Sequence, residues 1–126
     1  MILDPVSKQA ERKIWADLSF ICSNLTRMAI LHLLMKSKDT EYCLSLNEIS
    51  FRLGKYHRVI THHLEKLQEY GLVEVVKSSK NNKRRKIWGL NLEKADLIKE
   101  IYAYTLKNFF TQAMLEKACN VNKKLE

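Results

Sequence analysis

Residues 45–76 read SLNEISFRLGKYHRVITHHLEKLQEYGLVEVV, and this stretch decides the fold. Ser45 followed by Glu48 has the spacing of a capping box, which predicts the start of a short helix. Gly54 predicts its end, because glycine readily adopts the left-handed conformation of a helix C-terminus. A second helix is expected from about residue 56 to about residue 70. Two helices separated by a tight turn predict a helix-turn-helix.

A β-hairpin is predicted directly after this helix pair. Gly71 ends the second helix, and residues 72–76 are rich in the β-branched residues that favour strands. A polar turn is expected over 78–82, and residues 86–90 form the returning strand. A helix-turn-helix followed by a hairpin is the winged-helix plan, in which the hairpin forms a wing beside the second helix.

Further helices are predicted on both sides of this core. Asp4-Pro5 is a favourable helix opening, and a helix is expected to about residue 19. Ser23-Asn24 caps another helix, residues 42–44 are compatible with a short strand, and Asn91 caps a final helix over 92–118. The second helix carries apolar residues at three- and four-residue spacing, which is typical of core positions: Leu25, Met28, Ile30, Leu31, Leu34 and Met35.

The positive charge of the chain is concentrated in one block. Residues 52–86 contain ten lysines and arginines against three glutamates, an excess of seven in a net charge of +8. A basic excess confined to one block indicates a surface that meets a polyanion. Because the block coincides with the helix-turn-helix and the hairpin, we expect the partner to be double-stranded DNA.

The second helix of the pair has one apolar and one polar face. Ile60, Leu64 and Leu67 share the predicted core face, and the opposite face is polar. Base contacts are predicted for Arg58, Thr61 and His62. Phosphate contacts are predicted for Lys55, Tyr56, His57, Lys66, Lys80, Lys83, Arg84, Arg85 and Lys86. The alternative is that these residues only form a solvated polar face.

Metal, cofactor and catalytic sites are not expected. His57, His62 and His63 include no pair at the i, i+4 spacing of helical metal ligands, and His63 falls toward the core side. Cys22, Cys43 and Cys119 are widely spaced and are interpreted as reduced, mostly buried thiols. No nucleophile–base set, paired carboxylates or phosphate-binding loop stands out, so the chain is not expected to be an enzyme.

The final helix is apolar on more than one face, which predicts a homodimer. The interface is predicted from five residues: Trp15, Leu97, Ile101, Tyr104 and Phe109. A two-fold dimer would place two recognition helices about 34 Å apart, one turn of DNA. The alternative is that a small domain uses both terminal helices for its own core.

The expected fold is mainly α with a β-hairpin wing, a winged helix-turn-helix flanked by N- and C-terminal dimerisation helices. One domain over 1–126 is predicted, divided into a helix (1–22), the winged core (23–91), a dimerisation helix (92–118) and a frayed polar tail (119–126). The first residues lack the pattern of a signal peptide and no apolar run could span a membrane, so a cytoplasmic location is expected.

Two segments resemble the ArsR-type winged-helix regulators. Residues 23–34 are similar to their opening helix, and residues 59–67 with Tyr70-Gly71-Leu72-Val73 are similar to their recognition helix and its exit into the wing. The resemblance implies a homodimeric repressor that binds an inverted repeat and responds to an unidentified signal. The resemblance also implies that Arg58, Thr61 and His62 face the DNA.

The chain departs from the metal-sensing members of that family. Residues 47–51 (NEISF) stand where those members have a Cys-x-Cys motif, and the last helix has no histidine. The chain therefore resembles the metal-independent, often archaeal, members. Two other functions stay open: a winged helix for protein–protein contact, and a nonspecific, chromatin-like DNA binder.

Overall fold

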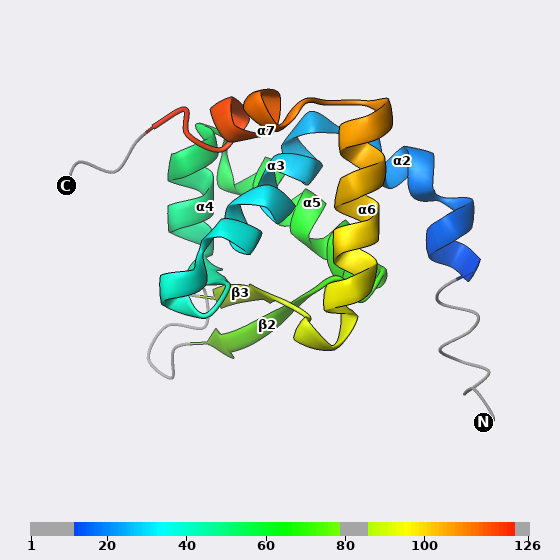
Figure 1. Ribbon diagram of the computed structural model, residues 1–126. Helices are drawn as coiled ribbons and strands as arrows, with labels where there is room; N and C mark the ends of the chain where they lie inside the picture. Colours follow the sequence, from blue (N-terminus) through cyan, green and yellow to red (C-terminus); the bar gives the residue numbers. More distant parts are fainter. Residues whose placement is uncertain (1–11, 79–85, 123–126) are drawn as a thin grey trace.

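The computed structural model describes residues 12–78 and 86–122, and its central element is helix α3 (Leu25–Lys36) (Figure 1). Asn24 caps α3, as predicted, by accepting a hydrogen bond from the Arg27 backbone N–H. Every residue from Arg27 to Leu34 is buried, so the predicted single apolar stripe was too narrow. Tertiary packing buries this part of α3 on all sides, because several helices and strand β3 contact it.

The helix-turn-helix consists of α4 (Leu46–Leu53) and α5 (His57–Glu69). The Ser45 hydroxyl accepts a hydrogen bond of 3.1 Å from the Glu48 N–H, and Gly54 has a φ of 63°. The predicted helix start and the glycine stop are both confirmed. Ile60, Leu64 and Leu67 are fully buried, which confirms the predicted core face of α5.

A small antiparallel sheet completes the core. Its strands are β1 (Cys43–Ser45), β2 (Val73–Ser78) and β3 (Lys86–Leu90), in the order β1-β3-β2. A Cβ on Gly89 would lie 2.6 Å from Cys43 Sγ and 2.7 Å from a Val76 methyl group, so only glycine allows this approach. A mainly helical fold with this sheet fits a winged helix-turn-helix, with β2 and β3 as the wing.

The N-terminal helix differs from the prediction of one helix over 5–19. Residues 12–16 are helical, the chain leaves helical geometry at Asp17, and α2 continues over Leu18–Cys22; residues 5–11 lie outside the described part. At this break the Asp17 carboxylate accepts a hydrogen bond of 3.0 Å from the Tyr70 hydroxyl. That contact joins residues far apart in sequence, so the local pattern does not contain it.

The prediction of one continuous helix over 92–118 is wrong. A short 3-10 helix, η2 (Leu92–Lys94), leads into α6 (Ala95–Asn108), and α7 (Gln112–Ala118) follows after a break. Thr111 caps α7 by accepting a hydrogen bond from the Met114 N–H. The break turns the chain so that α7 lies across α3 and buries Leu115 in the core (Figure 1).

The tail prediction is also wrong for residues 119–122. Cys119 is buried, and the Asn122 amide donates a hydrogen bond of 2.9 Å to the Phe51 carbonyl at the end of α4. Residues 123–126 lie outside the described part. The end of the described chain is therefore held against the helix-turn-helix.

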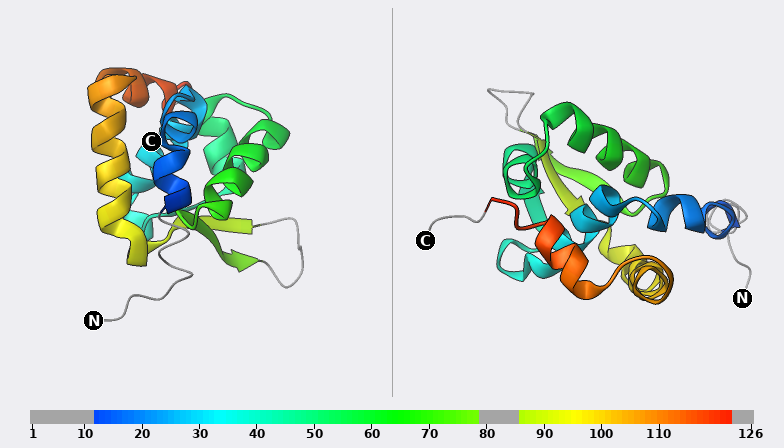
Figure 2. Two further views of the ribbon diagram at one scale, coloured as in Figure 1. Left: turned by 90° about the vertical axis from the view of Figure 1, so that its right-hand side faces the viewer. Right: turned by 90° about the horizontal axis from the view of Figure 1, so that it is seen from above.

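Helices α5 and α6 lie on different sides of the molecule. Figure 2 shows α5 and the sheet on one side and α6 on the other, with α3 between them. The fold thus separates a candidate DNA-binding side from the side that carries α6.

Candidate nucleic-acid interface

The exposed face of α5 carries the residues predicted to contact bases. Arg58 and His62 are exposed, and Thr61 is half-buried at the edge of this face. Glu65 is exposed beyond them. The structure therefore brings the three predicted base readers onto one face, and their contact with bases remains a prediction.

Within the described residues, the first backbone N–H groups of α5 have no hydrogen-bond acceptor. Tyr56 is its N-cap residue, forms no side-chain capping bond and is 85% exposed. The first helical bond runs from the Ile60 N–H to the Tyr56 carbonyl, so the N–H groups of residues 57–59 precede the helical ladder. Because a helix N-terminus is also the positive end of the helix dipole, it suits a phosphate oxygen. Exposed Lys55 and His57 add side-chain donors there.

The turn between α4 and α5 is held by its own hydrogen bonds. The Lys55 N–H donates to the Ser50 carbonyl at 3.1 Å, and the Ser50 hydroxyl donates back to the Lys55 carbonyl. The Gly54 N–H donates to the Phe51 carbonyl. These bonds fix the entry of the chain into α5, and hence the position of its first turn.

Only part of the basic wing is described. Lys86 is exposed at the start of β3, where it pairs with Ser78. The other predicted wing contacts, Lys80, Lys83, Arg84 and Arg85, lie outside the described residues.

Two basic residues of the charged block have partners within the chain. The Arg52 guanidinium donates a hydrogen bond of 2.6 Å to the Asn120 side chain and lies 3.8 Å from the Glu48 carboxylate. Lys66 lies 3.6 Å from Glu69 on the same helix. Arg52 therefore stabilises the fold, whereas Lys66 lies near the surface and its phosphate contact stays a prediction.

A buried histidine lies beneath the exposed face of α5. His63 is buried on the core side, as predicted, but its Nδ1 has no hydrogen-bond partner among the described residues, so the ring is not fully hydrogen-bonded, contrary to our expectation. Burial, together with the nearby positive charges of Arg27 and His62, lowers the pKa of His63 to about 4. His63 is therefore neutral near pH 7, because its charged form loses its hydration there.

The five predicted interface residues differ in exposure. Trp15 is 49% exposed and Phe109 is 37% exposed, and the rings of Tyr104 and Phe109 lie 6.1 Å apart. Leu97 and Tyr104 are half-buried. Ile101 is 0% exposed, since it fills the chain's own core, so it presents no surface to a partner and that part of the prediction needs correction.

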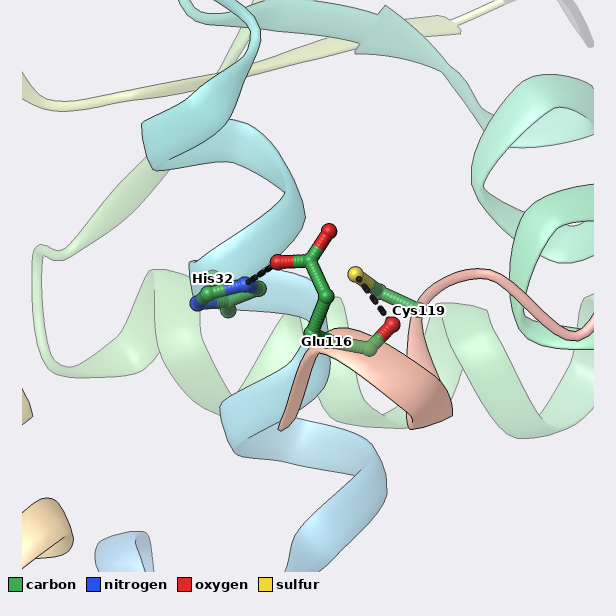
Figure 3. Close-up of side chains that lie close together, drawn as sticks. All are labelled: His32, Glu116 and Cys119. Atoms are coloured by element: carbon green, nitrogen blue, oxygen red, sulfur yellow. Dashed lines mark hydrogen bonds and ion pairs between the residues drawn. The ribbon is translucent and has the colours of Figure 1, made fainter. Parts of the chain in front are cut away.

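A second polar cluster joins α7 to α3 (Figure 3). His32 Nε2 lies 2.7 Å from Glu116 Oε2, and the Lys36 ammonium binds the same oxygen. These contacts, with Lys36 first, lower the pKa of Glu116 to about 2. The Cys119 thiol lies beside them, and one ligand atom from each of His32, Glu116 and Cys119 falls within 4.8 Å of the others.

Sequence reasoning missed this cluster and the contact of Asn120 with α4. His32 and Glu116 are 84 positions apart and Arg52 and Asn120 are 68 apart, so no spacing rule could pair them. The only local signal was the i, i+3 spacing of Glu116, on α7, and Cys119, the residue that caps the end of α7.

The comparisons with known proteins agree with this geometry. Residues 23–76 match the family model of a helix-turn-helix domain, and the match spans α3 to β2. The chain thus contains a helix-turn-helix domain, the kind found in DNA-binding regulators. Searches of the curated proteins and of the solved structures found no significant match. Within the described residues, no helix has the length and apolar character needed to cross a membrane.

Proposed function

We propose that the protein is a sequence-specific transcriptional regulator that binds double-stranded DNA through α5. The observation that supports this proposal is the exposed first half of α5, where Arg58 and His62 lie beside first-turn N–H groups that have no acceptor in the part of the chain that the structure describes. Side chains able to reach base edges and donors able to hold phosphate are thus adjacent. A recognition helix in the major groove requires both.

The two halves of the basic block have different roles in this proposal. Arg58, Thr61 and His62 read bases from the major groove, while Lys55, Tyr56 and His57 hold the phosphates at the helix start. The wing lysines and arginines add affinity that depends little on sequence. Such a protein acts by binding rather than by catalysis.

The finer proposal is an ArsR-type homodimeric repressor that binds an inverted repeat. Trp15 and Phe109 support it, since both are large apolar side chains left exposed by the single chain. A two-fold dimer would bury them and present two copies of α5 to the two half-sites.

Selection of bound duplexes from a random DNA pool tests the proposal most directly. We expect an enriched inverted repeat whose half-sites are about one helical turn apart. If six to eight phosphates are neutralised, the logarithm of the affinity should fall with the logarithm of salt concentration with a slope of roughly −5 to −7.

The same experiment separates the other functions. Retention of duplexes without any enriched sequence would indicate a nonspecific, chromatin-like binder. No retardation of any duplex in a gel at moderate salt would contradict DNA binding and favour a protein–protein module.

A further inference from the structure

We propose that His32, Glu116 and Cys119 form a binding site for one divalent metal ion of the zinc type. This site lies between α3 and α7, away from the exposed face of α5, and the inference does not depend on DNA binding. No metal site is expected from the sequence, in which His32 is far from Glu116 and Cys119.

The three side chains supply the donors that such an ion prefers. An imidazole nitrogen, a carboxylate oxygen and a sulfur come within 4.8 Å of one another, and all three point into one space (Figure 3). Ligand atoms around a four-coordinate zinc ion lie about 3.5 Å apart, so small side-chain rotations suffice. Three protein ligands leave a fourth position for water, and the mixed set with sulfur favours zinc over magnesium or calcium.

Each of two ligands already has an outer partner that would orient it. His32 Nδ1 lies 2.8 Å from the Tyr102 hydroxyl, and the Asn120 amide donates a hydrogen bond of 3.0 Å to Glu116 Oε1. Metal-bound histidines and carboxylates usually have partners of this kind. They leave His32 Nε2 and Glu116 Oε2 facing the proposed ion.

The proton balance of binding is simple. To bind the ion, His32 Nε2 must carry no proton, so the ring proton lies on Nδ1, which then donates to the Tyr102 oxygen. The Cys119 thiol loses its proton to solvent and binds as thiolate. Because the Glu116 carboxylate is already ionised, it loses no proton.

Lys36 is the competitor for this site. Its ammonium binds Glu116 Oε2, the oxygen that the metal would take. The Lys36 side chain is 49% exposed, so it can turn into solvent when an ion arrives. If the cluster served only as an ion pair, removing Lys36 would weaken it; if the cluster is a metal site, removing Lys36 strengthens it.

Hydrogen bonds also connect the proposed metal site to the helix-turn-helix. Asn120, which holds Glu116, accepts the hydrogen bond from Arg52 on α4. A bound metal would thus tighten a chain of contacts from α3 through α7 to α4.

Cobalt(II) titration of the chelator-treated protein tests the proposal. We expect one ion per chain, the strong visible bands of four-coordinate cobalt and a thiolate-to-cobalt charge-transfer band. Cys119→Ser should remove the charge-transfer band, whereas the control Cys43→Ser, at a thiol outside the cluster, should keep it. No charge-transfer band in the unaltered protein, or its loss only in Cys43→Ser, would overturn the proposal.

Two further variants test the site even if Cys119→Ser folds poorly. Glu116→Gln, at a partly exposed position, should weaken cobalt binding about tenfold or more. Lys36→Ala should tighten it severalfold, and zinc should then raise the melting temperature more than in the unaltered protein. Unchanged or weaker cobalt binding in Lys36→Ala would mean that the ion does not take the Glu116 oxygen that Lys36 binds, and would overturn the proposed site.

Discussion

Arg58 is the residue on which specific DNA binding is expected to depend most. It is exposed in the first turn of α5, and no contact within the described residues occupies its guanidinium. A planar guanidinium can donate two hydrogen bonds to one guanine, so it can carry sequence information. Lys86 is exposed on the wing and carries an ammonium group, which cannot donate this planar pair of hydrogen bonds. Lys86 is therefore expected to contact phosphate.

Arg58→Ala should weaken binding to the selected site by about 1–3 kcal/mol and leave binding to random duplex nearly unchanged. Lys86→Ala is the matched control, and it should weaken binding to both duplexes by a similar, smaller amount. Fluorescence anisotropy titrations on both duplexes at one salt concentration measure the difference. Equal losses on the two duplexes for Arg58→Ala would refute its role as a base reader.

His63 should make the stability of the fold depend on pH. Its pKa is about 4 in the folded chain and near 6.5 when unfolded, so between these values the unfolded chain binds more protons. The stability contribution of His63 is therefore complete above pH 6.5 and is lost as the pH falls toward 4. Between pH 7 and pH 5 the loss should be about 2 kcal/mol.

Urea unfolding at pH 7 and pH 5 checks this expectation. His63→Gln should lack that part of the pH dependence, whereas the control His57→Gln, at an exposed position on the same helix, should retain it. The same pH dependence in His63→Gln and in the unaltered protein would place the titrating group elsewhere.

The contact between the end of α7 and α4 couples two elements that are distant in sequence. Asn120 accepts a hydrogen bond from Arg52, and Asn122 donates one to the carbonyl end of α4. Both bonds reach α4, the helix that precedes α5. The segment after α7 is thus hydrogen-bonded to α4 and stabilises the helix-turn-helix.

Asn120→Ala should lower the free energy of unfolding by about 1–2 kcal/mol, because the half-buried Arg52 guanidinium loses an acceptor. Asn108→Ala is a suitable control, since in the described part of the chain its amide bonds only to the Tyr104 carbonyl of its own exposed turn. Chemical denaturation measures both variants. A loss no larger than that of Asn108→Ala would show that the segment does not support α4.

The assembly of two chains is expected on the side that carries α6 and the N-terminal helix. Trp15 and Phe109 are both exposed, and Figure 2 shows α6 on the side of α3 opposite α5. Burial of large aromatic side chains dominates many interfaces, so these two residues are the candidates for its centre.

Phe109→Ser should raise the dimer dissociation constant about 10- to 100-fold, with little effect on the fold. Phe51→Ser, at an exposed phenylalanine on α4, is the control and should leave the dimer intact. Sedimentation equilibrium gives the dissociation constants. A monomeric unaltered protein, or equal effects of the two variants, would contradict this interface.

Local signals in the sequence were sufficient for the helix-turn-helix. The capping position of Ser45, the stop at Gly54 and the apolar spacing of Ile60, Leu64 and Leu67 each depend on residues within one turn or a few turns of helix. The same spacing placed Arg58 and His62 on the exposed face. These features are visible in the sequence because short-range geometry produces them.

The breaks at Asp17 and Thr111, the burial of Ile101 and the His32–Glu116–Cys119 cluster appear only in the folded chain. Helix ends and docking angles depend on packing between distant segments, which outweighs local helix propensity. A helix continuous over 92–118 would satisfy that propensity, yet the break at Thr111 lets α7 bury Leu115 and brings Glu116 to His32. His32 and Glu116, 84 positions apart in the sequence, come into contact there because α7 packs on α3. A local sequence pattern cannot predict a contact of that kind.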